Sequence, residues 1–246
     1  TGRLIVGDDR AARALFVSAG RMDDWRARKA CAEALGRATP KVEATLRDAL
    51  AGLDDPREDV VRAALGTLAA LGSFAAEAVP KVLRWLQKGR YEYLGVIEAV
   101  TALEMIGSRP ELCVPALRAL LTRWSDEDIL CGRDCGAVHR AYRALGAFSD
   151  ARQEVIPPLL DALSPERRRL EHLVAQPALA SLARLGAPAS EVLPRVRALW
   201  EAILAEDDGT RPVEAGLARL MGGTVAHWRE KEPEAFRAAF AGFPPA

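Results

Sequence analysis

The sequence contains no asparagine, few aromatic residues and only five lysines, at positions 29, 41, 81, 88 and 231. Because Asn is absent, the chain offers no acceptor for N-linked glycosylation. Five lysines among 34 Lys and Arg leave 29 arginines. An Arg-, Ala- and Gly-rich composition without Asn is typical of a GC-rich coding genome and predicts a bacterial source.

The sequence also has no excess of charge and no long hydrophobic run. Its 34 basic residues balance 34 acidic ones, so net charge gives no general attraction to nucleic acid or to an anionic membrane. No stretch of about 18 apolar residues occurs, so we expect no membrane span. Half of the residues are hydrophobic, which excludes a disordered chain.

Cysteine is scarce, with four residues in a chain of this length. Such a count does not indicate a disulfide framework and favours a reducing compartment, so we expect a cytoplasmic location. We expect Cys31 and Cys113 to be small buried residues. The chain begins at Thr1 rather than Met, which suggests processing or a segment of a longer protein.

What the sequence has in abundance is a recurring bulky apolar residue followed by glycine. The six pairs lie at 35–36, 71–72, 106–107, 145–146, 185–186 and 221–222, so that successive glycines are 36, 35, 39, 40 and 36 residues apart. Glycine takes the left-handed conformation that ends many helices. A proline follows four of the glycines by eight or eleven residues, at positions 80, 115, 157 and 194, and we expect it in the first turn of the next helix.

The segments between these marks carry apolar residues at helical spacing, as at Val61, Leu65 and Leu68. No segment alternates apolar and polar residues, so we predict an all-α protein. One helix pair cannot bury both its faces, and pairs repeating at this interval are expected to stack into a right-handed α-α superhelix.

The segment 42–72 resembles a HEAT repeat. It has an apolar first helix, the turn Asp55-Pro56, the start of a second helix at Val61-Arg62, and the end at Leu71-Gly72. The resemblance fades from unit to unit but extends from about residue 23 to about residue 242. The bacterial HEAT-like repeats of the bilin-lyase type are the most similar kind.

The resemblance implies one HEAT-like domain over residues 1–246, with about six helix pairs. Residues 8–36 would form an N-terminal cap and a partial repeat. Full pairs are expected at 40–72, 75–107, 110–146, 151–186 and 189–222. A final helix over 225–243 would close the stack with its aromatic residues, and Trp85 and Trp200 are expected in the core.

In HEAT proteins the second helix of each pair lines the concave face, where partners bind. The equivalent positions here are Arg26, Arg62, Glu98, Thr101, Met105, Arg140, Gln176, Ser181 and Arg184. Their arginines predict a basic strip for an acidic partner or a phosphate, and an ordinary solvated face is the alternative. The enlarged loop 88–93 adds Arg90, Tyr91 and Tyr93, residue types that favour recognition surfaces.

No arrangement of residues indicates catalysis. Cys131, Cys135 and His139 form a C-x3-C-x3-H pattern, but glycines at 132 and 136 predict a helix beginning only near Cys135, and no fourth ligand is apparent. We therefore expect packing rather than a metal site, and no cofactor. The basic run 167–169 is flanked by acidic residues and is a weak candidate for phosphate contact.

These observations favour a non-catalytic scaffold for protein–protein interaction, presenting a concave helical face and one edge of loops. Two alternatives stay open. One is a nucleic-acid-binding module similar to the alkylation-repair solenoids, which would use the arginine strip but is opposed by the neutral charge. The other is an enzyme similar to the bilin lyases, whose helical stack holds a chromophore or a carrier protein.

Overall fold

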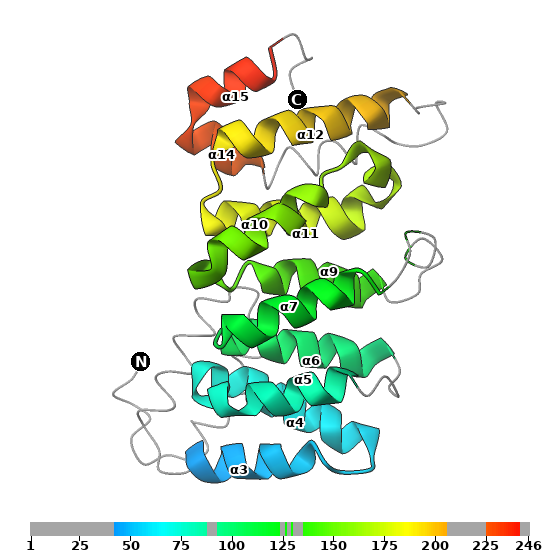
Figure 1. Cartoon of the computed structure of the whole chain (residues 1–246), viewed down its shortest axis with the longest axis vertical. Helices are drawn as coiled ribbons and strands as arrows, with labels where there is room; N and C mark the ends of the chain where they lie inside the picture. Colours follow the sequence, from blue (N-terminus) through cyan, green and yellow to red (C-terminus); the bar gives the residue numbers. More distant parts are fainter. Residues whose placement is uncertain are drawn as a thin grey trace. The chain divides into compact units, whose positions relative to one another are not determined.

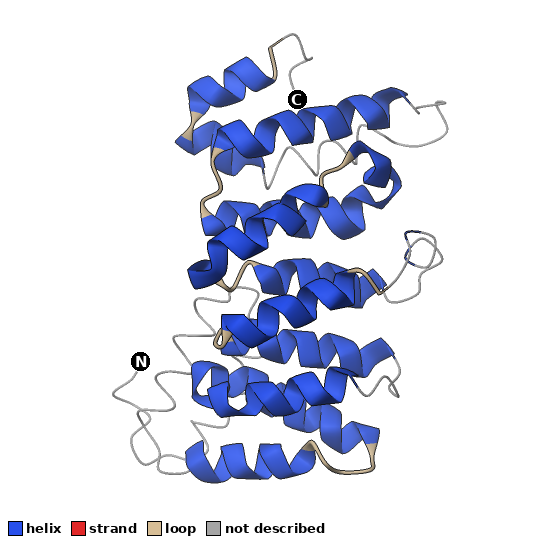
Figure 2. Ribbon diagram, viewed as in Figure 1, coloured by secondary structure: helices blue, strands red, loops and turns tan. Residues whose placement is uncertain are grey.

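A computed structural model describes residues 42–87, 93–123, 126, 129, 135–205 and 225–241 (Figure 1). Within these ranges every regular element is a helix and none is a strand (Figure 2), which confirms the all-α prediction. The chain divides into two compact units, Thr1–Leu117 and Arg118–Ala246.

The first unit contains α3 (Val42–Gly52), α4 (Glu58–Leu71), α5 (Val79–Gln87), α6 (Tyr93–Ile106) and the beginning of α7 (Pro110–Leu121). Helix α4 packs against α3 and α6, and α5 packs against α6. A seven-residue 3-10 segment, η1 (Gly72–Ala78), joins α4 to α5. The core consists of apolar side chains with almost no exposed surface, among them Leu65, Leu68, Val82, Val100 and Leu103.

The second unit contains α9 (Cys135–Leu145), α10 (Arg152–Asp161), α11 (Gln176–Leu185), α12 (Ala189–Ala205), α14 (Ala226–Lys231) and α15 (Pro233–Ala239). Helix α11 packs against α9 and α10, and α12 packs against α15 and the 3-10 segment η3 (Pro165–Leu170). Its most deeply buried large side chains include Leu145, Phe148, Leu159, Leu163 and Trp228. Trp85 and Trp200 are both buried, as expected.

The helices fall into the predicted segments. Segments 40–72, 75–107, 110–146 and 151–186 each contain two α-helices, and α12 begins at the start of segment 189–222. The second half of that last segment, and the cap expected over 8–36, lie outside the described residues.

Three of the predicted glycine stops have a positive φ angle. Gly186 has the left-handed helical conformation, whereas Gly72, with a ψ of −136°, does not. The φ angles are 58° at Gly72, 57° at Gly107 and 66° at Gly186, a region that side chains disfavour. Gly146 is different, because its φ is not positive. A Cβ atom there would lie 2.6 Å from Ser181 Oγ and 2.9 Å from Ser181 Cα, so close packing rather than backbone conformation requires glycine.

The prediction for the prolines was correct at Pro80, in the first turn of α5, and wrong at the other three. Pro115, Pro157 and Pro194 are the sixth residues of α7, α10 and α12. Each of these three is exposed, and so is the residue four positions earlier, whose carbonyl has lost its helical N–H donor. Water can bond such a carbonyl on the solvent side, so the helix continues through the proline.

The final helix predicted over 225–243 is also corrected. It is divided into α14 and α15 at Glu232, whose φ of −133° lies outside the helical range. Pro233 follows immediately and disfavours a helical conformation at the residue before it. Within the described part, the rings of Trp200 and Phe240 are 5.9 Å apart and those of Phe236 and Phe240 are 4.9 Å apart, so aromatic residues do join α15 to α12. Phe243 lies outside the described residues.

Candidate interaction face

In the first unit, α4 and α6 leave a stripe of partly exposed residues beside their contact. On α4 the stripe follows helical spacing and comprises Asp59, Arg62, Ala63, Gly66 and Thr67. On α6 it comprises Ile97, Glu98 and Thr101. Arg62, Glu98 and Thr101 are positions at which the sequence predicted a concave surface. Most residues of the stripe are polar or small and all are at least partly exposed, so this face is accessible to a partner.

Arg62 and Glu98 join the two helices across this face. The Nε and Nη2 atoms of Arg62 donate hydrogen bonds of 3.0 and 2.8 Å to the same Glu98 carboxylate oxygen. The hydrogen bond and the charge of Glu98 raise the pKa of Arg62. Both side chains keep about a third of their surface exposed, 38% and 27%, so solvent screens the pair. In this unit the predicted strip is therefore an ion pair rather than a basic surface.

In the second unit, α9 and α11 present the corresponding stripes. The partly exposed residues of α9 are Gly136, His139, Arg140 and Arg143, and those of α11 are Gln176, Ala180, Ala183 and Arg184. Arg184 Nη2 donates a 3.0 Å hydrogen bond to the backbone carbonyl of Arg143, which brings the two stripes together. Arg140 and Arg184, predicted from sequence, are thus on one face, together with Arg143, which sequence reasoning missed.

Two predicted face residues are not on the surface. Ser181 has no exposed surface and Met105 has 7%. Ser181 Oγ donates a 2.9 Å hydrogen bond to the carbonyl of Tyr142 on α9. It therefore lies in the contact between α11 and α9, where Gly146 provides the space. Met105 is in the last turn of α6 and is buried, as is Ala70 at the equivalent position of α4.

The remaining predicted residues cannot be assigned to a face. Arg26, Arg90 and Tyr91 lie outside the described residues. Tyr93 opens α6, but its side chain is likewise outside the described part of the chain. The loop 88–93 as a recognition surface stays a prediction.

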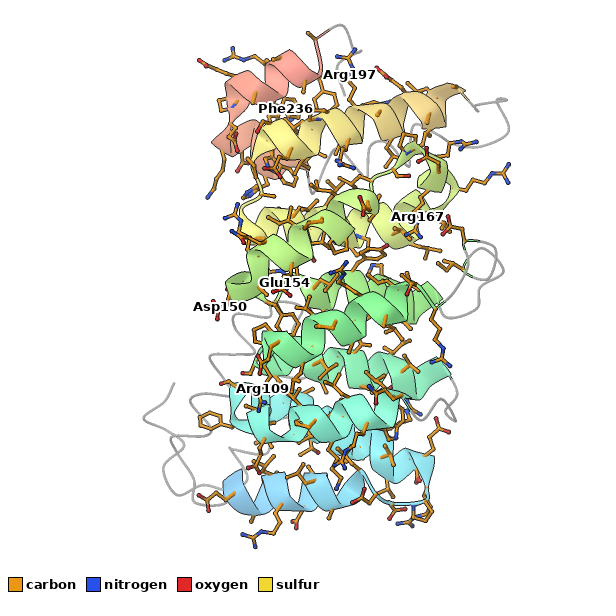
Figure 3. All side chains as sticks on the ribbon, in the orientation of Figure 1. Arg109, Asp150, Glu154, Arg167, Arg197 and Phe236 are labelled. Carbon is orange, nitrogen blue, oxygen red and sulfur yellow. The ribbon has the colours of Figure 1, made fainter. Side chains whose placement is uncertain are left out.

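A cluster that sequence reasoning missed surrounds Arg167, the first residue of the basic run (Figure 3). Arg167 Nη1 donates a 2.8 Å hydrogen bond to the hydroxyl of Tyr142, and its Nη2 is 3.2 Å from a carboxylate oxygen of Asp126. Burial raises the pKa of Tyr142. Arg168 donates to the carbonyl of Pro165 at 3.3 Å. Two arginines of the run therefore make contacts within the fold.

The expected absence of a metal site and of a membrane span both stay predictions. Among the described side chains, no group of three His, Cys, Asp or Glu residues could hold a metal ion, but the side chains of Cys131 and Cys135 are outside that set. One helical run, Glu58–Gln87, is long and apolar enough to cross a membrane. That run consists of α4, η1 and α5 and has a non-helical residue at Ala75.

Comparison with known proteins gives no relative. No protein-family model, no curated protein and no solved structure matches the chain. The fold and the faces described above are therefore the basis for any functional proposal.

Proposed function

We propose that this protein is a non-catalytic scaffold for protein–protein interaction, built as a right-handed HEAT-like stack of helix pairs. The proposal is supported by helix pairs in the segments that the repeat predicts. Consecutive second helices also pack on one another, α4 on α6 and α9 on α11. Repeats that contact mainly their neighbours form extended binding surfaces from such helices.

The observation that carries the proposal is the open stripe along these second helices. On α4, Ala63 and Gly66 are exposed, and a Cβ atom added at Gly66 would meet nothing within 4 Å. Small residues between polar ones allow a partner backbone to approach closely. In the described part of the chain, Phe74 and Leu204 are the only exposed large hydrophobic residues, so we expect a partner with a polar rather than an apolar surface.

Site-specific photocrosslinking tests the proposal. A benzophenone amino acid is placed at Ala63 or Ala180 on the stripes, and at Arg84 or Arg118 as matched exposed positions on first helices. The proteins are incubated with lysate of the source cells. We expect discrete protein adducts from the stripe positions and not from the matched positions.

Two outcomes would contradict the scaffold. Equal adducts from all four positions would show that the stripes are not selective. Nucleic-acid adducts would favour the alternative module, for which the arginines of α9 and α11 are the supporting observation. An electrophoretic shift with DNA that weakens steeply with salt would independently favour the same alternative.

A further inference from the structure

Arg167 joins three separate parts of the second unit. It belongs to η3, and its Nη1 atom donates a 2.8 Å hydrogen bond to the hydroxyl of Tyr142 on α9. Its Nη2 atom lies 3.2 Å from a carboxylate oxygen of Asp126, a residue between α7 and α9. The side chain of Arg167 is 27% exposed and that of Asp126 is 39% exposed. A guanidinium and a carboxylate therefore meet at a position that solvent reaches.

Tyr142 holds this guanidinium without neutralising it. The tyrosine is 3% exposed, and burial raises the pKa of its hydroxyl, so the side chain is a neutral phenol at neutral pH. A neutral hydrogen-bond partner fixes the position of the Arg167 side chain and leaves its positive charge to attract a carboxylate. Within the described part of the chain, Asp126 is the one acidic residue that forms an ion pair with Arg167.

Asp126 uses only part of the binding capacity of this guanidinium. Among the described residues, the Nε atom of Arg167 donates no hydrogen bond, and Asp126 lies against Nη2. Arg62 shows the fuller arrangement, because both its Nε and its Nη2 donate to Glu98. Carboxylates held by two N–H groups of an arginine are bound more strongly and more specifically. Exposed ion pairs contribute little to stability, so a carboxylate that engages both nitrogens can replace Asp126.

We propose that Arg167 binds a single carboxylate side chain of a partner protein, and that Asp126 occupies this site until the partner arrives. The inference rests on the scaffold function proposed above and adds a contact at the edge of loops between paired helices. A carboxylate is favoured over a phosphate because the group already seated on Arg167 is a carboxylate. The negative charge of Asp161, which also acts on Tyr142, opposes a ligand of higher negative charge.

Side-chain NMR titration of the full chain tests this proposal. The probe is N-acetyl-glutamate with an amidated α-carboxyl group, so it has one carboxylate. The reporter is the Nε–H signal of Arg167, which is assigned by its loss in Arg167→Lys. Asp126→Asn removes the internal competitor, so we expect this variant to bind the probe about threefold or more tightly than the wild type does. The matching glutamine compound should bind neither protein, because it has no carboxylate.

Two controls separate this competition from a general effect of charge. Asp150→Asn removes the same charge at an exposed position beyond the other end of α10 (Figure 3), roughly 15 Å of helix away. Salt screens charges at that separation, so the affinity should change by less than about 1.5-fold. The Nε–H signal of Arg169, an exposed neighbour, should report no gain in Asp126→Asn. Circular dichroism establishes folding, and Asp126→Ser replaces the Asn variant if that variant unfolds.

Three results would overturn the proposal: equal affinity of Asp126→Asn and the wild type, the same gain in Asp150→Asn, or tighter binding of inorganic phosphate than of the probe to Asp126→Asn. These results differ from failure of the scaffold itself. If selective crosslinks from Ala63 and Ala180 persist while Asp126→Asn gives no gain, the scaffold stands and only the carboxylate site is rejected. Loss of those crosslinks rejects the scaffold, whatever affinity is measured at Arg167.

Discussion

The thiol of Cys113 shows how burial changes the pKa of a single residue. Its side chain is fully buried in α7, and its sulfur donates a 3.4 Å hydrogen bond to the carbonyl of Ser108. Its own backbone N–H bonds the carbonyl of Arg109, which has a φ of 59°. Burial raises the pKa of the thiol to about 12, with a smaller contribution from the charge of Glu111.

This pKa predicts a loss of stability in alkali. The folded thiol stays protonated up to about pH 12, whereas an unfolded thiol ionises near about pH 8.5. Between these values the unfolded state releases a proton that the folded state keeps, so the free energy of unfolding decreases as pH rises. Urea titrations at about pH 8 and about pH 10, on either side of most of this ionisation, should show a smaller decrease in Cys113→Ala than in the wild type. An equal decrease in both proteins would show that Cys113 ionises normally in the fold.

At the scale of the element, two glycines inside helices have opposite surroundings. Gly66 in α4 is exposed and has open space around it, whereas a Cβ at Gly95 in α6 would lie 2.5 Å from the ring of Trp85. Glycine within a helix costs about 0.5–1 kcal/mol relative to alanine. At Gly66 no contact within the described fold offsets that cost. At Gly95 the packing of Trp85 leaves no room for a Cβ atom, so glycine is required there.

The two positions therefore predict opposite effects of the same substitution. Gly66→Ala should raise the free energy of unfolding by about 0.5–1 kcal/mol, because it removes backbone freedom without a clash. Gly95→Ala should lower it by about 1–3 kcal/mol, as overpacking does. Denaturant titration of both variants measures the difference. A destabilised Gly66→Ala would mean that α4 is covered there by another part of the protein.

At the same scale, the sequence predicted where helices end better than where they begin. The recurring glycines mark helix ends, because the positive φ angle at Gly72, Gly107 and Gly186 is a local requirement that favours glycine. The prolines were harder to interpret. An exposed proline is tolerated within a helix wherever water can bond the carbonyl four residues earlier, which lacks its helical N–H donor. Whether that carbonyl is exposed to water depends on which side of the helix packs against its neighbours, and the proline itself does not indicate this.

At the scale of the whole molecule, the candidate faces were partly predictable. Repeat spacing placed Arg62, Glu98, Arg140 and Arg184 on second helices, and the structure shows them partly exposed there. The same spacing failed for Ser181, whose hydroxyl bonds the carbonyl of Tyr142 within the contact between α11 and α9, although Thr67, the equivalent residue of α4, is partly exposed. Ion pairs such as that of Glu98 with Arg62 depend on which helices pack together, and spacing alone does not predict them.

The contacts of each helix predict how stability is distributed along the chain. Helix α4 packs against α3, α6 and η1, whereas α11 packs against α9, α10 and the π-helical turn. In repeat proteins, where contacts are with neighbours, a local defect weakens nearby repeats most. Leu65 in α4 and Leu182 in α11 both have no exposed surface, so replacing either with Ala should cost about 2–5 kcal/mol locally.

Native-state hydrogen exchange resolves where that cost appears. Leu65→Ala should lower amide protection chiefly in α3, α4 and α6, and Leu182→Ala chiefly in α9, α10 and α11. The two variants serve as controls for one another, because the deleted atoms are the same and both sites are fully buried. Equal loss of protection in all these helices would show that the chain unfolds as one cooperative block, and the neighbour-only account of its stability would then be wrong.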